Sequence, residues 1–254
     1  MRVDRLTYVG HATTLIELDG VALLTDPVLR DRIGHVRRIA PPVTDRLHPD
    51  AMLISHAHRD HLDLPSLRLL PSSVPAFAPP VAAELLRRAG RPVTELAAGQ
   101  RVRVGQLEIA AVEAAHDGRR IPAGRARDSI GYLIEGTVCV YFAGDTDLFA
   151  GMRDLAAGGI DVALLPVWGW GPRLGPGHLD PERAARAAGV LKPRVAVPIH
   201  WGTFATARAW WRSDPAMPAR EFERYAALHA PDAAVSILHP GESSPLSPAA
   251  REAS

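Results

Sequence analysis

The sequence has very little cysteine, no long apolar run and no clear targeting segment. Cys139 is the only cysteine among 254 residues, which excludes an internal disulfide, and we expect it to be a small buried hydrophobic residue. No stretch approaches the ~18 apolar residues of a membrane span, and residues 1–5 begin no apolar signal segment. We therefore expect a cytoplasmic protein without a transmembrane segment.

An excess of positive charge is also lacking. Lys and Arg total 29 against 28 Asp and Glu, and this balance removes the electrostatic argument for a nucleic-acid partner. Hydrophobic residues make up 47% of the chain, which is compatible with one large domain. We predict a single domain over residues 1–243 and a flexible Ser-, Pro- and Ala-rich tail over residues 244–254. Composition leaves the oligomeric state, including a homo-oligomer, open.

Metal-binding residue types, by contrast, are concentrated in the run Ser55-His56-Ala57-His58-Arg59-Asp60-His61. The run follows Ala51–Ile54, an apolar segment that we predict to be a buried strand. His56 and His58 are two residues apart, so they project to the same side of an extended chain. Asp60 and His61 are adjacent and can face a second ion where the chain turns. A lone loop histidine would be interpreted as solvated, but four such residues at this spacing predict a metal site.

Three more residues of ligand type stand at the ends of predicted strands. His116 follows the alternating segment 107–113, and His200 follows the apolar segment 195–199. Asp145 follows the apolar segment 138–143 and a glycine that permits a sharp turn. Each residue taken alone is compatible with an ordinary loop, but together the three would complete two metal shells.

The order His-x-His-x-Asp-His, followed by a distant His, Asp and His, resembles the signature of the metallo-β-lactamase superfamily. The resemblance implies an α/β fold, the four-layer αβ/βα sandwich, with a dinuclear metal site at the edge between the two sheets. It also implies the ligands: one metal ion is bound by His56, His58 and His116, and the other by Asp60, His61 and His200. Asp145 would bridge the two ions, and a hydroxide would be the second bridge.

Other segments resemble one branch of that superfamily, the N-acyl-phosphatidylethanolamine-hydrolysing phospholipases D and the ascorbate-6-phosphate lactonases. They are Gly10-His11-Ala12-Thr13, Leu24-Thr25-Asp26-Pro27, residues 142–146, residues 178–182, residues 199–204 and residues 239–242. The phospholipase is the nearer match. The resemblance implies a metal-dependent phosphodiesterase that acts on a small-molecule or lipid-like substrate. Imidazole and carboxylate ligands favour zinc, although Mn²⁺ and Fe²⁺ suit similar ligands.

Four further residues have expected roles near this site. Asp60 would orient the attacking hydroxide as well as bind metal, and Asp26 would hold the ligand loop in place rather than bind metal. His178 would protonate a leaving alkoxide or hold a phosphate oxygen, with a solvent-facing loop histidine as the alternative. For His11, a place near the site and a purely structural hydrogen bond are equally compatible with the sequence.

Two groups of residues could shape a substrate pocket. Trp168, Trp170 and Trp201 would form an apolar wall, although core packing explains them nearly as well. Arg119, Arg120, Arg125 and Arg127 would bind an anionic substrate, although a solvated loop is the default interpretation.

Other functions remain as alternatives. The same centre would serve a lactonase or another carboxylic ester hydrolase. A di-iron oxidoreductase is less favoured, because redox relatives usually have Glu at the position of His58. A non-catalytic binding protein would normally have lost ligands, and a nuclease is disfavoured by the neutral charge.

Secondary structure can be predicted around these motifs. Strands are expected at Leu6–Val9, Thr14–Leu18 and Val21–Leu24, with a hairpin turn at Asp19-Gly20. Helices are expected at Pro80–Ala89 and at Pro181–Leu191, the latter with Asp180 as N-cap.

Overall fold

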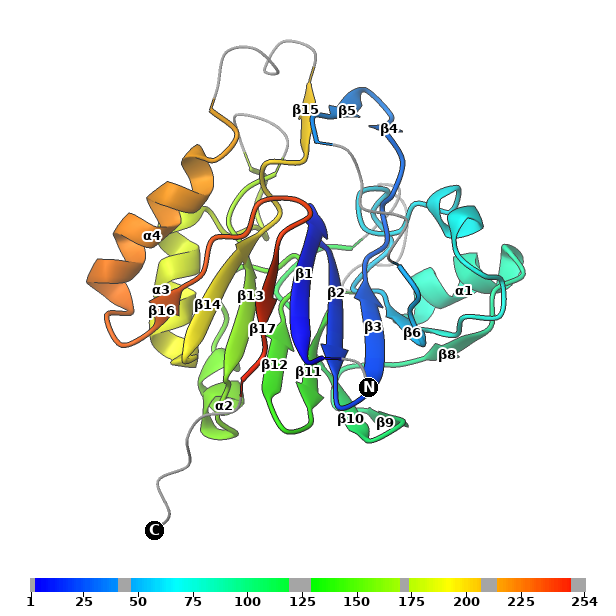
Figure 1. Cartoon of the computed structure of the whole chain (residues 1–254), viewed down its shortest axis with the longest axis horizontal. Coiled ribbons are helices and arrows are strands. Elements are labelled where there is room, and N and C mark those ends of the chain that lie inside the picture. The colour runs from blue at the N-terminus through cyan, green and yellow to red at the C-terminus, as the bar shows by residue number, and fades with distance from the viewer. Residues whose placement is uncertain (1–2, 41–46, 119–128, 170–173, 207–213, 248–254) are drawn as a thin grey trace.

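The structure is a computed structural model that describes residues 3–40, 47–118, 129–169, 174–206 and 214–247. Within these ranges, two seven-stranded mixed β-sheets lie face to face (Figure 1). The first sheet has the order β17 (Ser243–Pro245), β1 (Arg5–Gly10), β2 (Thr13–Leu18), β3 (Val21–Thr25), β6 (Ala51–Leu53), β7 (Ala76–Ala78) and β8 (Val93–Glu95). Strands β1, β2 and β3 are antiparallel neighbours, and β3, β6, β7 and β8 are parallel.

The second sheet repeats this plan of antiparallel strands followed by parallel ones. Its order is β16 (Ala234–Val235), β14 (Val195–Ile199), β13 (Val162–Pro166), β12 (Cys139–Phe142), β11 (Ile130–Glu135), β10 (Leu107–Glu113) and β9 (Arg101–Val104). A small third sheet joins β15 (Phe204–Thr206), β5 (Val36–Arg38) and β4 (Arg32–Ile33).

Helices cover the outer faces of the two large sheets (Figure 1). Helix α1 (Pro80–Arg88) lies against the first sheet, and α2 (Met152–Ala157), α3 (Pro181–Leu191) and α4 (Met217–His229) lie against the second. A short 3₁₀ helix, η1 (Ser66–Leu69), lies between β6 and β7 in the chain. Among the described residues, no helix is long and apolar enough to cross a membrane. The layers confirm the predicted αβ/βα sandwich.

Alternation along the strands of the first sheet divides their side chains between two apolar layers. Ile16 of β2 packs in the same cluster as Ile109 and Tyr132 of the second sheet, between the two sheets. Its neighbour Leu15 points the other way, into the cluster that contains Leu86 of α1. Because the side-chain period of a strand is two, a shift of one residue would reverse both faces. The hydrophobic pattern therefore fixes the register of the central strands.

The strand directions bring many chain turns to one edge of the sandwich. In the first sheet β1, β3 and β6 run in the same direction, and in the second sheet so do β10, β12 and β14. Each of these strands ends shortly before a residue that the sequence analysis singled out: His11, Asp26, His56, His116, Asp145 and His200.

The elements expected from the sequence are present with small shifts in their ends. Helix α3 has the predicted bounds, and the Asp180 side chain accepts a hydrogen bond of 2.8 Å from the Arg183 N–H at its N-terminus. Helix α1 ends at Arg88, one residue earlier than expected. The three N-terminal strands are each found at or within a residue or so of their predicted ends.

The predicted C-terminal tail begins too early. Ser244 and Pro245 belong to β17, which pairs with β1, and the side chain of Leu246 is buried. The backbone of this segment completes the edge of the first sheet, which composition alone did not indicate. Residues 248–254 of the predicted tail lie outside the described part of the chain.

Cys139 is half-buried at the start of β12, and not fully buried as expected. Burial raises the pKa of its thiol to about 11, and the nearby carboxylates of Glu135 and Asp161 act in the same direction.

Because the thiolate is the reactive form, we predict that iodoacetamide alkylates Cys139 at pH 8 about 100-fold more slowly than an ordinary thiol. Mass spectrometry of the native and the urea-unfolded chain would measure this difference. Equal rates in the two states would contradict it.

Candidate metal centre

The histidine-rich run leaves β6 through a tightly held turn. Asp26, at the end of the neighbouring strand β3, accepts hydrogen bonds from the Ser55 N–H at 2.7 Å and from the Ser55 hydroxyl at 2.6 Å. The same carboxylate lies 2.7 Å from Nδ1 of His61. Asp26 is fully buried and thus joins both ends of the run to β3. This is the holding role that the sequence analysis expected of it.

The first group of converging side chains is His56, His58 and His116. Nδ1 of His58 lies 2.9 Å from Nε2 of His56 and 3.1 Å from Nε2 of His116. His56 and His116 are buried, whereas His58 is partly exposed. One ligand atom from each residue lies within 4.8 Å of the others, so the three could hold one ion.

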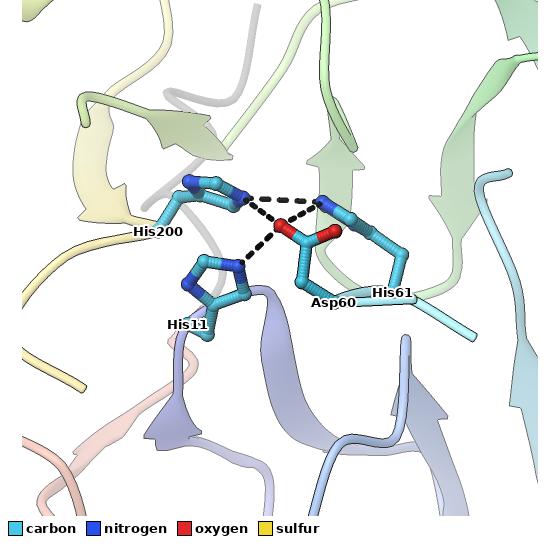
Figure 2. A group of neighbouring side chains, drawn as sticks. All are labelled: His11, Asp60, His61 and His200. Atoms are coloured by element: carbon cyan, nitrogen blue, oxygen red, sulfur yellow. Dashed lines mark hydrogen bonds and ion pairs between the residues drawn. The ribbon is translucent and has the colours of Figure 1, made fainter. Parts of the chain in front are cut away.

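The second group is Asp60, His61 and His200, joined by His11 (Figure 2). Nε2 of His61 and Nε2 of His200 face each other at 3.1 Å, and Oδ2 of Asp60 lies 3.9 Å from each of them. The loop after β6 and the turn after β14 therefore meet at this point, as their places at the strand ends predict.

Asp145 lies between the two groups. Its Oδ2 is 3.1 Å from Nε2 of His61 and 3.9 Å from Nε2 of His56, and its Oδ1 is 3.4 Å from Nε2 of His200. The preceding residue, Gly144, has φ +60°, and a Cβ there would meet the Cβ of Ser55 at 2.6 Å. A glycine is thus required for the close approach that brings Asp145 to the centre.

The outer nitrogens of the histidines are held by fixed hydrogen bonds. Nδ1 of His116 donates to the Gly177 carbonyl at 2.8 Å, and Nδ1 of His200 donates to the Trp168 carbonyl at 2.5 Å. Nδ1 of His56 lies 3.0 Å from the Ser55 hydroxyl, which gives its own proton to Asp26. In these neutral rings the proton is on Nδ1, so Nε2 presents a lone pair toward the centre.

Charge in the centre is strongly coupled. Burial would raise the pKa of the Asp145 carboxyl, but His200 and His61 hold it well below its ordinary value. Burial lowers the pKa of His200 to about 3, so this ring is neutral. Burial would also lower the pKa of His61, but Asp145 and Asp26 raise it well above its ordinary value. The carboxylates of Asp145 and Asp26 therefore stabilise a positive charge at the position of His61.

The donor set fits divalent metal ions. The neutral rings of His56, His116 and His200 present Nε2 lone pairs toward the centre, and Oδ1 of Asp145 is buried without a hydrogen-bond donor. A cation placed among these atoms would satisfy them and supply the charge that the carboxylates require. Imidazole with carboxylate is a ligand set of zinc, and iron and manganese accept similar shells.

His178 lies at the partly exposed side of the centre. It precedes α3, its side chain is 24% exposed, and its Nε2 is 3.4 Å from Oδ2 of Asp145. Nδ1 of His178 donates to the Gly175 carbonyl at 3.0 Å, which fixes the direction of the ring. The expected solvent-facing alternative for His178 therefore does not describe its position.

Trp201 does not form part of the expected wall. Trp201 is buried, stacks on Tyr8 with ring centroids 5.9 Å apart, and donates from its indole nitrogen to the Pro198 carbonyl. Core packing therefore explains Trp201, whereas Trp168 packs partly buried at the edge of the core. Trp170, and the cluster Arg119, Arg120, Arg125 and Arg127, lie outside the described residues.

The sequence left the place of His11 undecided and assigned no role to Ser55. His11 is buried, and its Nε2 is 3.1 Å from Oδ2 of Asp60. Its pattern, a glycine and then a polar residue directly after a strand, is the one that pointed to Asp145. The hydroxyl of Ser55 could not have been singled out, because its bonds depend on the turn that Asp26 enforces.

Comparisons with known proteins agree with this geometry. A family model described as a β-lactamase superfamily domain matches residues 22–201. A metal-dependent hydrolase of Methanopyrus kandleri is 33% identical over 247 residues, covering 94% of this chain and 98% of the relative. An N-acyl-phosphatidylethanolamine-hydrolysing phospholipase D of Caenorhabditis elegans is 30% identical over 226 residues, covering 78% of this chain but only 64% of the phospholipase.

A solved structure shows the same fold over nearly the whole chain. It is a metallo hydrolase of the archaeon Ignicoccus hospitalis, with a TM-score of 0.72 and 27% sequence identity, covering 97% of this chain and 99% of the other. The family model spans the strands that precede His56, His116, Asp145 and His200. The chain therefore belongs to the metallo-β-lactamase superfamily, as its His-x-His-x-Asp-His run predicts.

Proposed function

We propose that this protein is a metal-dependent phosphodiesterase with two divalent ions, zinc being the preferred metal. The observation that carries the proposal is the pair of converging groups that share Asp145. His56, His58 and His116 would hold one ion, and Asp60, His61 and His200 the other, with Asp145 between them. When bound, two such ions lower the pKa of water and neutralise the charge that develops on an attacked phosphorus or carbonyl centre.

The side chains at the centre have separate tasks in this proposal. The carboxylate of Asp60 accepts a hydrogen bond from the attacking water and so orients it. Nε2 of His178, 3.4 Å from Oδ2 of Asp145, gives a proton to the leaving oxygen or donates a hydrogen bond to a phosphate oxygen. The hydrogen bond of His178 to the Gly175 carbonyl holds Nε2 toward the centre for this purpose.

A phosphodiester is the proposed substrate class because the phospholipase relative matches 78% of this chain. The substrate would be a small or lipid-like anionic molecule. A lactone or another carboxylic ester would use the same centre, with attack at carbon in place of phosphorus, and a direct comparison of substrates separates the two classes.

Replacing His58 removes one proposed ligand from the first group. We predict that His58→Ala lowers turnover of bis-p-nitrophenyl phosphate by at least about 100-fold while the chain stays folded, because His58 is partly exposed and its loss leaves the core intact. Turnover, metal content and circular dichroism would be measured together. His35→Ala is the matched control, since His35 is exposed on the turn between β4 and β5. Full turnover by chelator-treated, metal-free protein would refute a metal-dependent hydrolase.

The substrate class can be tested on the metal-loaded protein. We expect turnover of phosphodiesters in a side-by-side assay with lactones and carboxylic esters, and the loss of that turnover after chelation. His58→Ala protein serves as the background control for every substrate. Turnover of lactones alone would replace the phosphodiesterase proposal by a lactonase.

The role of His178 predicts a dependence on the leaving group. A good leaving group such as p-nitrophenolate needs no proton, whereas an alkoxide does. We therefore expect His178→Asn to lower turnover of an alkyl phosphodiester by about 100-fold and that of the p-nitrophenyl ester by only a few fold. A uniform loss on both substrates would instead assign His178 to binding of a phosphate oxygen.

A further inference from the structure

His11 occupies a strained position that joins both sides of the centre. It lies in the turn between β1 and β2 with φ +57°, a left-handed conformation that non-glycine residues rarely adopt. Its N–H donates to the Thr203 hydroxyl at 2.7 Å, and its carbonyl accepts from the His200 N–H at 2.7 Å. The backbone of His11 is thus fixed against the turn that carries His200.

The ring of His11 is aimed at Asp60. It is 1% exposed, and Phe204 lies edge-on beside it, with ring centroids 5.4 Å apart. Figure 2 shows Nε2 of His11 facing the carboxylate of Asp60, and the distance from Nε2 to Oδ2 is 3.1 Å. The strained backbone and the packed ring together leave this nitrogen little freedom to point elsewhere.

The ring of His11 packs closely against the ring of His200, with centroids 3.7 Å apart and planes 35° apart. A nitrogen of His11 lies within 4.8 Å of ligand atoms of Asp60, His61 and His200, which is also compatible with a place in the metal shell. Its Nε2, however, lies 3.1 Å from Oδ2 of Asp60, a hydrogen-bond distance to an acceptor. This contact places His11 to donate a hydrogen bond to Asp60, and direct ligation of an ion is the alternative outcome of the metal-binding test.

Asp60 is the member of the second group that needs such support. Its side chain is 19% exposed, whereas those of His61 and His200 are 0% and 3% exposed. Asp60 also lies in the loop after β6, where its carboxylate can rotate toward water. A fixed donor on Oδ2 opposes that movement.

We propose that His11 is a positioning residue for Asp60: its Nε2–H donates to Oδ2 and holds the carboxylate toward His61 and His200. Its effect is on the affinity of the second metal position, and it leaves the group His56, His58 and His116 unchanged. The inference rests on the proposed two-ion function.

Metal binding tests the role without any substrate. Zinc affinities would be measured by competition with a chromophoric chelator, and stoichiometry by elemental analysis. We expect two ions per wild-type chain, a 10- to 100-fold weaker second site in His11→Leu, and a nearly unchanged first site. His11→Gln, whose amide nitrogen can take the place of Nε2, should restore most of the affinity. His35→Leu is the control at an exposed histidine.

A double-mutant cycle with Asp60→Ala distinguishes positioning from direct ligation. If His11 acts through Asp60, His11→Leu costs no further affinity once Asp60 is absent; a further loss would make His11 a ligand and overturn the proposal. His11→Asn provides a second test, because Asn tolerates the left-handed conformation and its amide is too short to reach Asp60. Wild-type affinities for both ions in the Leu and Asn variants would also overturn it. Failure of the two-ion function would appear differently, as fewer than two ions in the wild-type chain.

Discussion

The buried carboxylate of Asp26 is the constraint on which the rest of the centre depends. It accepts hydrogen bonds from both donors of Ser55 and lies 2.7 Å from Nδ1 of His61. A buried carboxylate without these partners would be costly, so the loop must fold back over β3 to supply them. This turn sets the direction of the histidine-rich segment, residues 55–61. Through the Ser55 hydroxyl it also sets the direction of the His56 ring. One acidic side chain therefore orients parts of both metal-binding groups.

The same principle extends to the second sheet, with backbone carbonyls in place of the carboxylate. An imidazole has two nitrogens, so a hydrogen bond on the outer one both selects the tautomer and aims the inner one. The Gly177 carbonyl does this for His116, and the Trp168 carbonyl does it for His200. These acceptors stand in loops whose positions follow from the sheet. The scaffold thus specifies the protonation pattern as well as the positions of the side chains.

Much of the fold and of the candidate site could be predicted because both follow local patterns. Apolar or alternating segments followed by a ligand-type residue predicted the strands β6, β10, β12 and β14, and strands that run in the same direction bring such ends to one edge. What could not be predicted depends on distant contacts: β17 is a strand only because it pairs with β1, and Trp201 is buried because Tyr8 stacks on it. The direction of the His11 ring likewise depends on Thr203 and His200, far away in the chain.

Backbone strain is concentrated where these distant contacts meet. Of the five non-glycine residues with positive φ in the described chain, His11, Asp26 and His200 all lie at the candidate metal centre. Each directly follows one of the large-sheet strands, so the left-handed turn bends the chain at the sheet edge and directs the side chain back over it. Such residues cost of order 1–3 kcal/mol each and persist only where surrounding contacts over-determine them. The hydrogen bond between the His200 N–H and the His11 carbonyl is such a contact, because it couples two strained turns from different sheets. The centre is therefore held by the same bonds that join the two halves of the sandwich at this edge.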